Sequence, residues 1–177
     1  MKKQWVQVIR LAEQAFFTII FSANKRVGDR GIILPKRFNS KLKIRRFLQK
    51  FMTPCLANRV IGNLDLRRIN GQLAIPVGDT IGAPPIVKSK VLSSGSRCAT
   101  LVVWFAFDSS DRFFRVYQLK KLPNGRWIVV GRHPLDYPFN LPQDLLKRQI
   151  PCGKICTPWR GKLKTRKKLL SSKKIRY

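Results

Sequence analysis

The sequence predicts an α+β protein in which N-terminal helices pack on a curved antiparallel sheet of about four strands. Two observations lead to this prediction. Apolar residues recur at helical spacing up to about residue 62, and β-branched and aromatic residues dominate short runs between about residues 86 and 133. A hydrophobic fraction of 44% supplies enough apolar surface for a core. Helices followed by an antiparallel meander is the order typical of α+β folds.

Residues 4 to 22 predict the first helix, with apolar side chains over a wide face. We interpret it as a helix that docks on the sheet. The alternative is a helix lying on a membrane through Phe16, Phe17, Ile19, Ile20 and Phe21. A signal peptide is disfavoured because Arg10, Glu13 and Gln14 interrupt the segment. The apolar run is also too short for a spanning helix.

The segment NSKLKIRRFLQKFM predicts a second helix, which Asn39 or Ser40 can cap. One stripe of it is apolar, at Ile44, Phe47, Leu48 and Phe51. The other face is cationic, and residues 36 to 50 contain seven Lys or Arg and no acidic residue. A solvated surface normally mixes charge signs, so we favour a binding face here.

A third helix is predicted for TPCLANRVIG, with Thr53 as N-cap, Pro54 at the first helical position and Gly62 at its end. The stretch before the second helix is predicted as a connector. The stretch after the third helix is predicted as loops with short edge strands, since Gly and Pro interrupt it repeatedly.

Four strands are predicted in the second half. The first lies near residues 86 to 92. The segment CATLVVWFAF follows, apolar on both alternating faces and therefore central in the sheet. Residues 112 to 121 and 126 to 133 are joined by a turn containing Asn124-Gly125, a strong hairpin signal. We divide the chain into an N-terminal helix and connector at 1–35, a core domain at 36–145 and a basic, flexible tail at 146–177.

This order of elements resembles the nuclear-transport-factor-like superfamily, cone-shaped α+β proteins that include the ketosteroid isomerases. The matching stretch covers about residues 41 to 133, from KLKIRRFLQKFMTPCLANRVIG to the hairpin RFFRVYQLKKLPNGRWIVVG. The resemblance implies a pocket inside the cone, where the enzymes of the superfamily place an acidic residue or a His. The candidates here are Asp65, Asp79, Asp108 and Asp111, none of which the sequence singles out. Other members are adaptors or subunits of secretion and translocation machines.

Charge is the outlying property, with 37 Lys plus Arg against 8 Asp plus Glu and a formal net charge of +29. Such a field favours a polyanionic partner. We therefore expect a non-enzymatic protein that binds nucleic acid, RNA in preference to DNA, as in a ribonucleoprotein. The cationic residues expected to contact phosphates are Lys41, Lys43, Arg45, Arg46, Lys50, Arg160, Lys162, Lys164, Arg166, Lys167, Lys168, Lys173, Lys174 and Arg176.

The face of Phe113, Arg115 and Tyr117 on the third predicted strand could instead stack bases, although we favour packing of its rings under the helices. Two alternatives to the nucleic-acid function remain. The basic surface could bind an acidic protein or an anionic membrane, which makes the chain a membrane-associated adaptor. The chain could also be a small enzyme that uses the cone pocket.

Few residues support catalysis or metal binding. His133 is the only His and Glu13 the only Glu, which limits acid–base chemistry, and we interpret His133 as structural. Cys152 and Cys156 are weak zinc candidates, because further ligands would have to come from Cys55, Cys98 or His133. We expect no cofactor. Four Cys fit an intracellular, reducing compartment.

Overall fold

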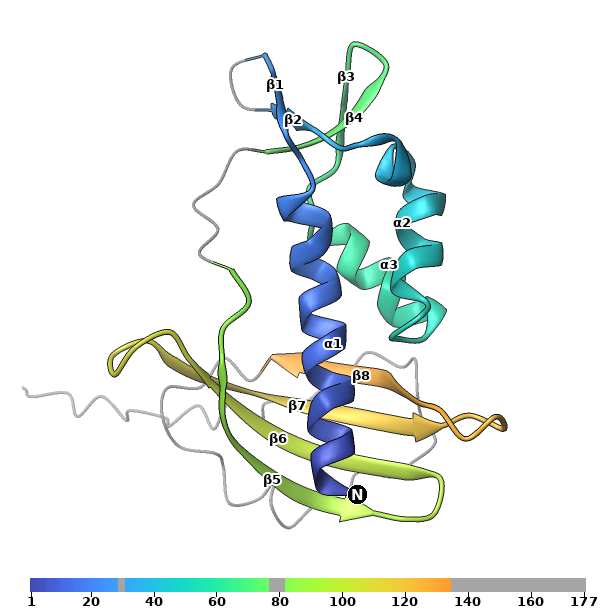
Figure 1. Ribbon diagram of the computed structural model, residues 1–177, viewed down its shortest axis with the longest axis vertical. Helices are drawn as coiled ribbons and strands as arrows, with labels where there is room; N and C mark the ends of the chain where they lie inside the picture. Colours follow the sequence, from blue (N-terminus) through green and yellow to red (C-terminus); the bar gives the residue numbers. More distant parts are fainter. Residues whose placement is uncertain (29–30, 77–81, 135–177) are drawn as a thin grey trace, which may run out of the picture.

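The computed structural model describes residues 1–28, 31–76 and 82–134 of the chain. It confirms the α+β prediction, with helices packed on antiparallel sheets (Figure 1). The elements in order are α1 (Lys2–Phe21), β1 (Lys25–Val27), β2 (Gly31–Ile33), the 3₁₀ turn η1 (Lys36–Phe38), α2 (Lys41–Leu48), α3 (Pro54–Gly62), β3 (Arg67–Ile69), β4 (Gln72–Pro76), β5 (Ile86–Ser94), β6 (Cys98–Ala106), β7 (Arg112–Lys121) and β8 (Trp127–Pro134).

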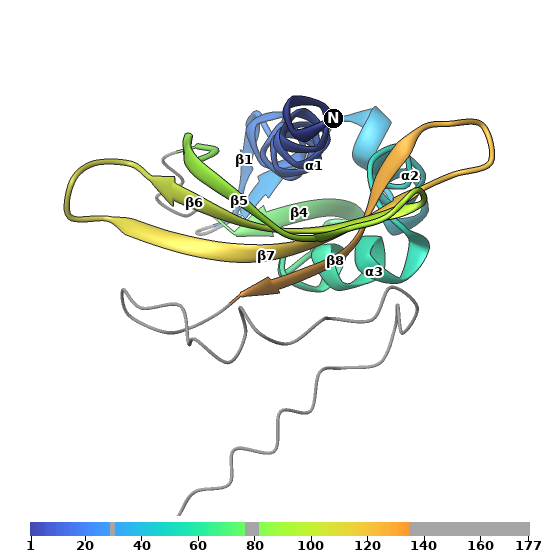
Figure 2. The same cartoon turned by 90° about the horizontal axis from the view of Figure 1, so that it is seen from below.

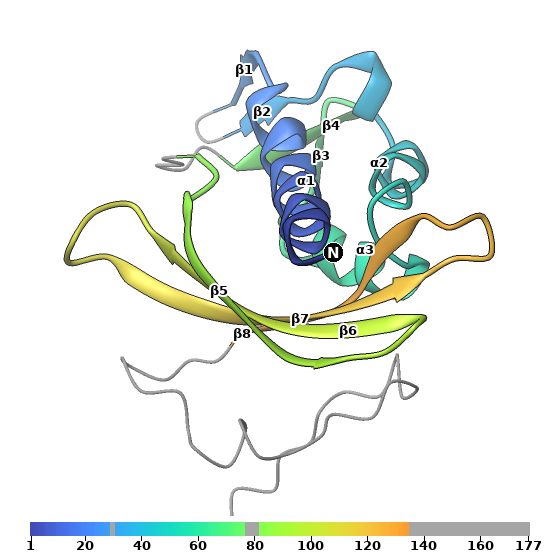
Figure 3. The same cartoon turned by 60° about the horizontal axis from the view of Figure 1, so that its bottom comes forward.

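The larger sheet is the predicted meander, with strand order β5-β6-β7-β8 and antiparallel neighbours throughout. β6 is central and largely buried along its whole length, as its apolar residues predicted. The Asn124-Gly125 turn joins β7 to β8, and Gly125 has the positive φ of 82° that such turns require. The sheet is curved, and the three helices lie on its concave side (Figure 3).

The first helix docks on this sheet, as expected. Trp5, Ile9, Ala12 and Ile19 on one side of α1 are buried in the main core together with inward side chains of β6, β7 and β8. Trp5 meets Trp127 of β8 edge to face, with ring centroids 5.5 Å apart. Figure 2 shows α1 end-on above the sheet. The helix therefore belongs to the same core as the strands.

A second, smaller sheet was not predicted as such. Its order is β1-β2-β4-β3, and β2 pairs with β4 across more than forty residues of sequence. The prediction had a connector where β1 and β2 lie, because strands of three residues leave almost no periodic pattern. β3 and β4 form a hairpin around Asn70 and Gly71, both with positive φ. This sheet and α2 lie at the end of the molecule away from β5–β8 (Figure 1).

The two short helices begin where the sequence predicted. Ser40 caps α2, since its hydroxyl accepts a hydrogen bond of 3.3 Å from the backbone N–H of Lys43. Ile44 and Leu48 are fully buried, which leaves the rest of α2 to the surface. Thr53 is the N-cap of α3 by position, but its hydroxyl makes no capping bond and is buried without a hydrogen-bond partner.

A β-bulge in β8 changes which side chains face the helices. Leu119 pairs with Val129 and Gln118 pairs with Gly131, so Val130 is an extra residue without an opposite partner. Simple alternation from Val129 would send Gly131 inward and Arg132 outward. The bulge shifts the phase, and Arg132 lies inward opposite Tyr117. A Cβ on Gly131 would lie 2.6 Å from Oε1 of Gln118 and 3.3 Å from its Cβ, so a larger residue here would force Gln118 to move.

We expect Gly131→Ala to lower the free energy of unfolding by about 1 to 2 kcal/mol, because the added methyl group crowds Gln118. Gln118→Ala removes the obstructing side chain, so the double variant should recover most of that loss. Urea unfolding of the two single variants and the double variant measures this coupling. If the losses of the two single variants simply add in the double variant, the glycine is required by the backbone of the bulge and not by the contact with Gln118.

Candidate functional site

Five cations lie on α2 and on the turn that follows it, and we call this group the α2 face. It consists of Lys41, Lys43, Arg45 and Arg46 on α2 and of Lys50 two residues after its end, and all five residues are exposed. Their exposure follows from the apolar stripe on the opposite side of the helix, where Ile44 and Leu48 are buried. The five residues are those that the sequence predicted for phosphate contact.

Lys43 differs from the other four cations. Its ammonium group donates hydrogen bonds of 2.8 Å to the backbone carbonyl of Lys36 and to the side-chain oxygen of Asn39. It thereby ties the start of α2 to η1. The side chains of Lys41, Arg45, Arg46 and Lys50 have no hydrogen-bond or ion-pair partner among the described residues, so their donors are free for a ligand.

Further cations surround the α2 face. Residues 31–76 contain ten Lys or Arg and one acidic residue, Asp65, which forms an exposed ion pair of 2.7 Å with Arg67. Exposed pairs of this kind contribute little to stability. The exposed cations on neighbouring elements are Lys25, Arg26, Lys36, Arg37, Arg59, Arg67 and Arg68. This end of the molecule therefore has a strong positive potential with few acidic groups to offset it.

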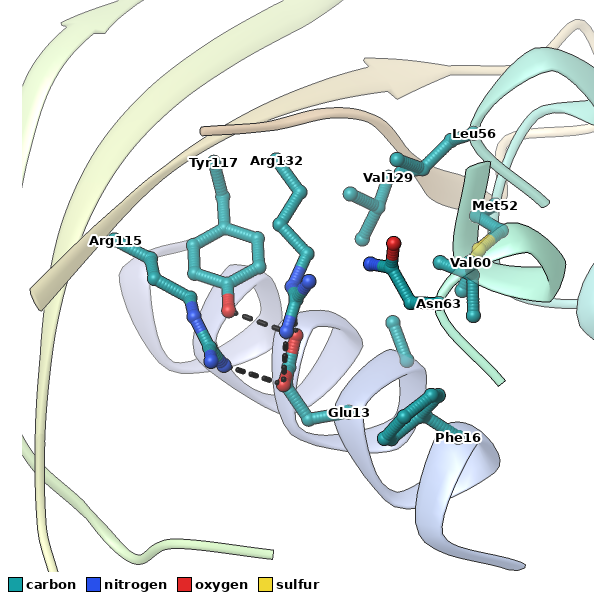
Figure 4. Close-up of a pocket in the computed structure, with 11 residues that line it drawn as sticks. Glu13, Phe16, Met52, Leu56, Val60, Asn63, Arg115, Tyr117, Val129 and Arg132 are labelled. Carbon is teal, nitrogen blue, oxygen red and sulfur yellow. Dashed lines mark hydrogen bonds and ion pairs between the residues drawn. The ribbon is translucent and has the colours of Figure 1, made fainter. Parts of the chain in front are cut away.

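The concave side of the larger sheet holds a buried polar cluster around Glu13, which the sequence did not predict as a site. Glu13 lies on α1 with 5% of its surface exposed. Its carboxylate accepts hydrogen bonds from Tyr117 at 2.8 Å and Arg115 at 2.8 Å, and from Arg132 at 2.7 and 3.2 Å (Figure 4). The cluster connects α1 to both β7 and β8. Its only signal in the sequence is a single Glu within an otherwise apolar helix face.

The four hydrogen bonds occupy the carboxylate fully. Two reach Oε1 and two reach Oε2, and an ionised carboxylate has about four acceptor positions. Two guanidinium groups against one carboxylate leave the cluster with a net positive charge. Glu13 therefore has no free lone pair with which to take a proton from a substrate, and its geometry suits a structural clamp.

The contacts of the cluster raise the pKa of two of its members. Burial raises the pKa of the Tyr117 phenol well above its ordinary value, and the neighbouring Glu13 raises it further, so the phenol stays a hydrogen-bond donor. Burial by itself would lower the pKa of Arg132. The attraction and hydrogen bonds of Glu13 and Tyr117 together outweigh burial and raise that pKa overall.

A cavity of about 220 Å³ adjoins the cluster. Glu13, Arg115 and Arg132 form its polar side, and Phe16, Met52, Leu56, Val60 and Val129 are among its apolar walls (Figure 4). Of the aspartates that the resemblance implied, Asp65, Asp108 and Asp111 do not line it. Asp65 and Asp111 are exposed, and Asp79 lies outside the described residues. Asp108 is exposed in the β6–β7 turn, where bonds from Ser110 and the Asp111 amide lower its pKa.

Among the described residues, His133, Cys55 and Cys98 belong to no group that could hold a metal. Burial, and then the charge of Arg59, lower the pKa of His133, which favours a neutral side chain. Cys55 is a half-buried free thiol, and Cys98 is half-buried and disulfide-bonded. The described residues contain no cluster of three His, Cys, Asp or Glu that could hold a metal.

The aromatic residues divide between the core and the surface. Phe113 and Tyr117 face the helices, which confirms our preference for packing over base stacking. In the segment that could have met a membrane, Ile19 is buried, Phe16 and Ile20 are half-buried against the core, and Phe21 is 58% exposed. No helix within the described residues has both the length and the apolar character needed to cross a membrane.

The remaining predicted residues lie outside the part of the chain that the structure describes. They are Arg160, Lys162, Lys164, Arg166, Lys167, Lys168, Lys173, Lys174 and Arg176, together with Cys152 and Cys156. Comparison with protein-family models found no match, and comparison with curated proteins found none either. The resemblance to the nuclear-transport-factor-like superfamily therefore stays a prediction.

We expect Glu13→Gln to lower the free energy of unfolding by about 3 kcal/mol, because it leaves two partly buried guanidinium groups without a counter-charge. Tyr117→Phe removes one hydrogen bond and should cost about 1 to 2 kcal/mol. Asp111→Asn, the same loss of charge at an exposed position, should change stability by less than about 0.5 kcal/mol. Urea unfolding checks the order. Equal effects of Glu13→Gln and Asp111→Asn would contradict a buried clamp.

The lowered pKa of His133 predicts acid sensitivity. The folded protein binds this proton less readily than the unfolded chain, whose His has the ordinary pKa of 6.5. Stability should therefore fall as the pH drops through 6.5 and level off below the folded pKa. His133→Gln should remove this component, so that unfolding curves of the two proteins diverge only on the acid side. If the variant lost more stability at acid pH than the unmodified protein, the expected sign would be wrong.

Proposed function

We propose that this protein binds RNA through phosphate contacts made by the α2 face, without catalysing a reaction. The basic residues of segment 160–176 would form a second set of contacts on the same strand. Phosphate recognition requires cationic density and does not require a defined base-reading pattern. The protein would then act as a component of a ribonucleoprotein, in which RNA neutralises its net charge of +29.

The observation that supports this proposal best is the free state of the cations on α2. Lys41, Arg45 and Arg46 on α2 and Lys50 just after it are exposed and have no partner among the described residues. A surface that is cationic only for solubility usually carries acidic residues in between. Here the acidic residue of the neighbourhood, Asp65, is already paired with Arg67. The arrangement therefore suits an external polyanion.

A membrane-associated adaptor is the second candidate, and two rings favour it. Phe17 and Phe21 stack on each other at 6.1 Å on α1, and Phe21 is largely exposed. A helix that lies in a membrane interface presents a long apolar face, whereas most apolar residues of α1 are used in the core. We rank an enzyme last, because the acidic residue at the cavity has all four acceptor positions filled.

The test is a salt titration of binding to mixed-sequence RNA with the full-length chain. The variant Lys41→Gln, Arg45→Gln, Arg46→Gln, Lys50→Gln removes the four free cations of the α2 face. Each phosphate contact contributes about 0.7 to 0.9 to the slope of log affinity against log salt. The slope of the variant should therefore flatten by about 3 units.

A control with the same loss of charge separates local contact from net charge. Lys90, Arg97, Lys120 and Arg126 are exposed on and around the larger sheet, so their replacement by Gln should change the slope by less than about 1 unit. Equal flattening by both variants would show that the α2 face is not the binding surface. Stronger binding of anionic vesicles than of RNA by the unmodified chain would move the adaptor to first place.

A further inference from the structure

A surface groove runs between α2 and α3, beside the α2 face. It encloses about 580 Å³ and is open to solvent. Lys41, Leu42 and Arg45 of α2 form one side, and Asn58 and Ile61 of α3 form the other. Leu66, which follows α3, also lines it. The two helices lie next to each other, and α3 also contacts β8 (Figure 1).

The rim of the groove on the α2 side is cationic. Lys41 and Arg45 are one helical turn apart, so their side chains project from the same side of α2. Both also belong to the α2 face, and neither has a partner among the described residues. A strand whose phosphates follow the α2 face would pass directly along this rim.

Part of the groove lining is apolar. Leu42 is 46% exposed although it stands between two cations. Ile61 and Leu66 also line the groove. An aliphatic surface of this kind can cover one face of a flat ring, as in pockets that hold an extruded base.

Two polar groups reach the same groove. The side-chain amide of Asn58 is exposed and has no hydrogen-bond partner among the described residues. It can both donate and accept, which is the capacity needed at the edge of a base. Asp65 also lines the groove, and its pairing with Arg67 offsets the charge that would otherwise repel a phosphate.

Gly62 lines the groove as well. It is the last residue of α3, where glycine is less favourable than alanine by up to about 1 kcal/mol. Its φ is not positive, and a Cβ on it would have no atom within 4 Å. Neither the backbone nor a neighbouring side chain therefore requires glycine. A larger side chain at this position would project into the groove.

We propose that the groove between α2 and α3 holds one unpaired base of an RNA strand. Lys41 and Arg45 contact the phosphates on either side of that base, Leu42 and Leu66 cover its face, and Asn58 bonds to its edge. The inference rests on the proposed function and deepens it, because it assigns single-stranded RNA as the preferred ligand. In a duplex the bases are stacked and paired, so only the phosphate contacts remain.

The experiment compares an unstructured single-stranded RNA with a duplex RNA of equal phosphate number, using full-length protein. Gly62→Leu should weaken binding of the single strand about tenfold and leave duplex binding unchanged. Gly62→Ala is too small to fill the groove and should bind both RNAs as the unmodified chain does. Gln14→Leu adds the same side chain at an exposed position of α1 and should also have no effect.

The outcomes separate this inference from the proposed function. If the unmodified chain binds both RNAs with strong salt dependence and Gly62→Leu binds the single strand normally, the groove inference is wrong and the proposed function stands. If the unmodified chain binds neither RNA, the proposed function itself fails. Unchanged RNA binding by Gly62→Leu together with lost binding of an acidic peptide would also overturn the inference. Thermal unfolding of Gly62→Leu checks that this variant is folded. Asn58→Ala is an independent test, because we expect it to weaken binding of the single-stranded RNA and to leave duplex binding unchanged.

Discussion

The interaction on which the rest of the structure depends is the contact of Glu13 with Arg115, Tyr117 and Arg132. The chain has a net charge of +29, so its cations repel one another and a buried carboxylate offsets part of that repulsion. This one binds two guanidinium groups at the centre of the concave face. It fixes α1 to two strands at once, and it prevents two inward-facing arginines from facing each other without a counter-charge. The apolar contacts of Trp5 and Ile9 also hold α1 against the sheet, but they do not reduce the repulsion between the two arginines.

The charge balance of the clamp differs from that of the α2 face. Because Glu13 offsets one of their two charges, Arg115 and Arg132 add less to the external field than two unpaired cations would. The cations of α2 have no comparable partner, and Asp65, which lines the groove beside them, is bound to Arg67. The fold thus offsets part of the positive charge that it buries and leaves charge unpaired where solvent is available. Excess charge that is concentrated on one short helix can bind a linear polyanion more effectively than the same charge spread over the whole surface.

Much of the fold could be predicted, because its main elements rest on local patterns. The stripe of Ile44 and Leu48, the Ser40 cap and the Asn124-Gly125 turn each act within a few residues. The small sheet could be predicted only in part. Asn70-Gly71 is the same hairpin signal as Asn124-Gly125, and it could have identified β3 and β4. The pairing of β2 with β4 joins distant segments, and three residues leave no periodicity to detect.

The sites, like the elements of the fold, differ in whether a local sequence pattern predicts them. The α2 face follows from the helix period alone, because a residue opposite a buried stripe must be exposed. The Glu13 cluster depends on the bulge at Val130, which reverses the alternation of β8 and brings Arg132 inward against the simple pattern. The groove depends on the packing of α3 against α2, which no single segment encodes. A cationic helix in a sequence can therefore indicate where phosphates bind. Whether a base is also bound depends on the neighbouring helix, whose packing against α2 forms the other side of the groove.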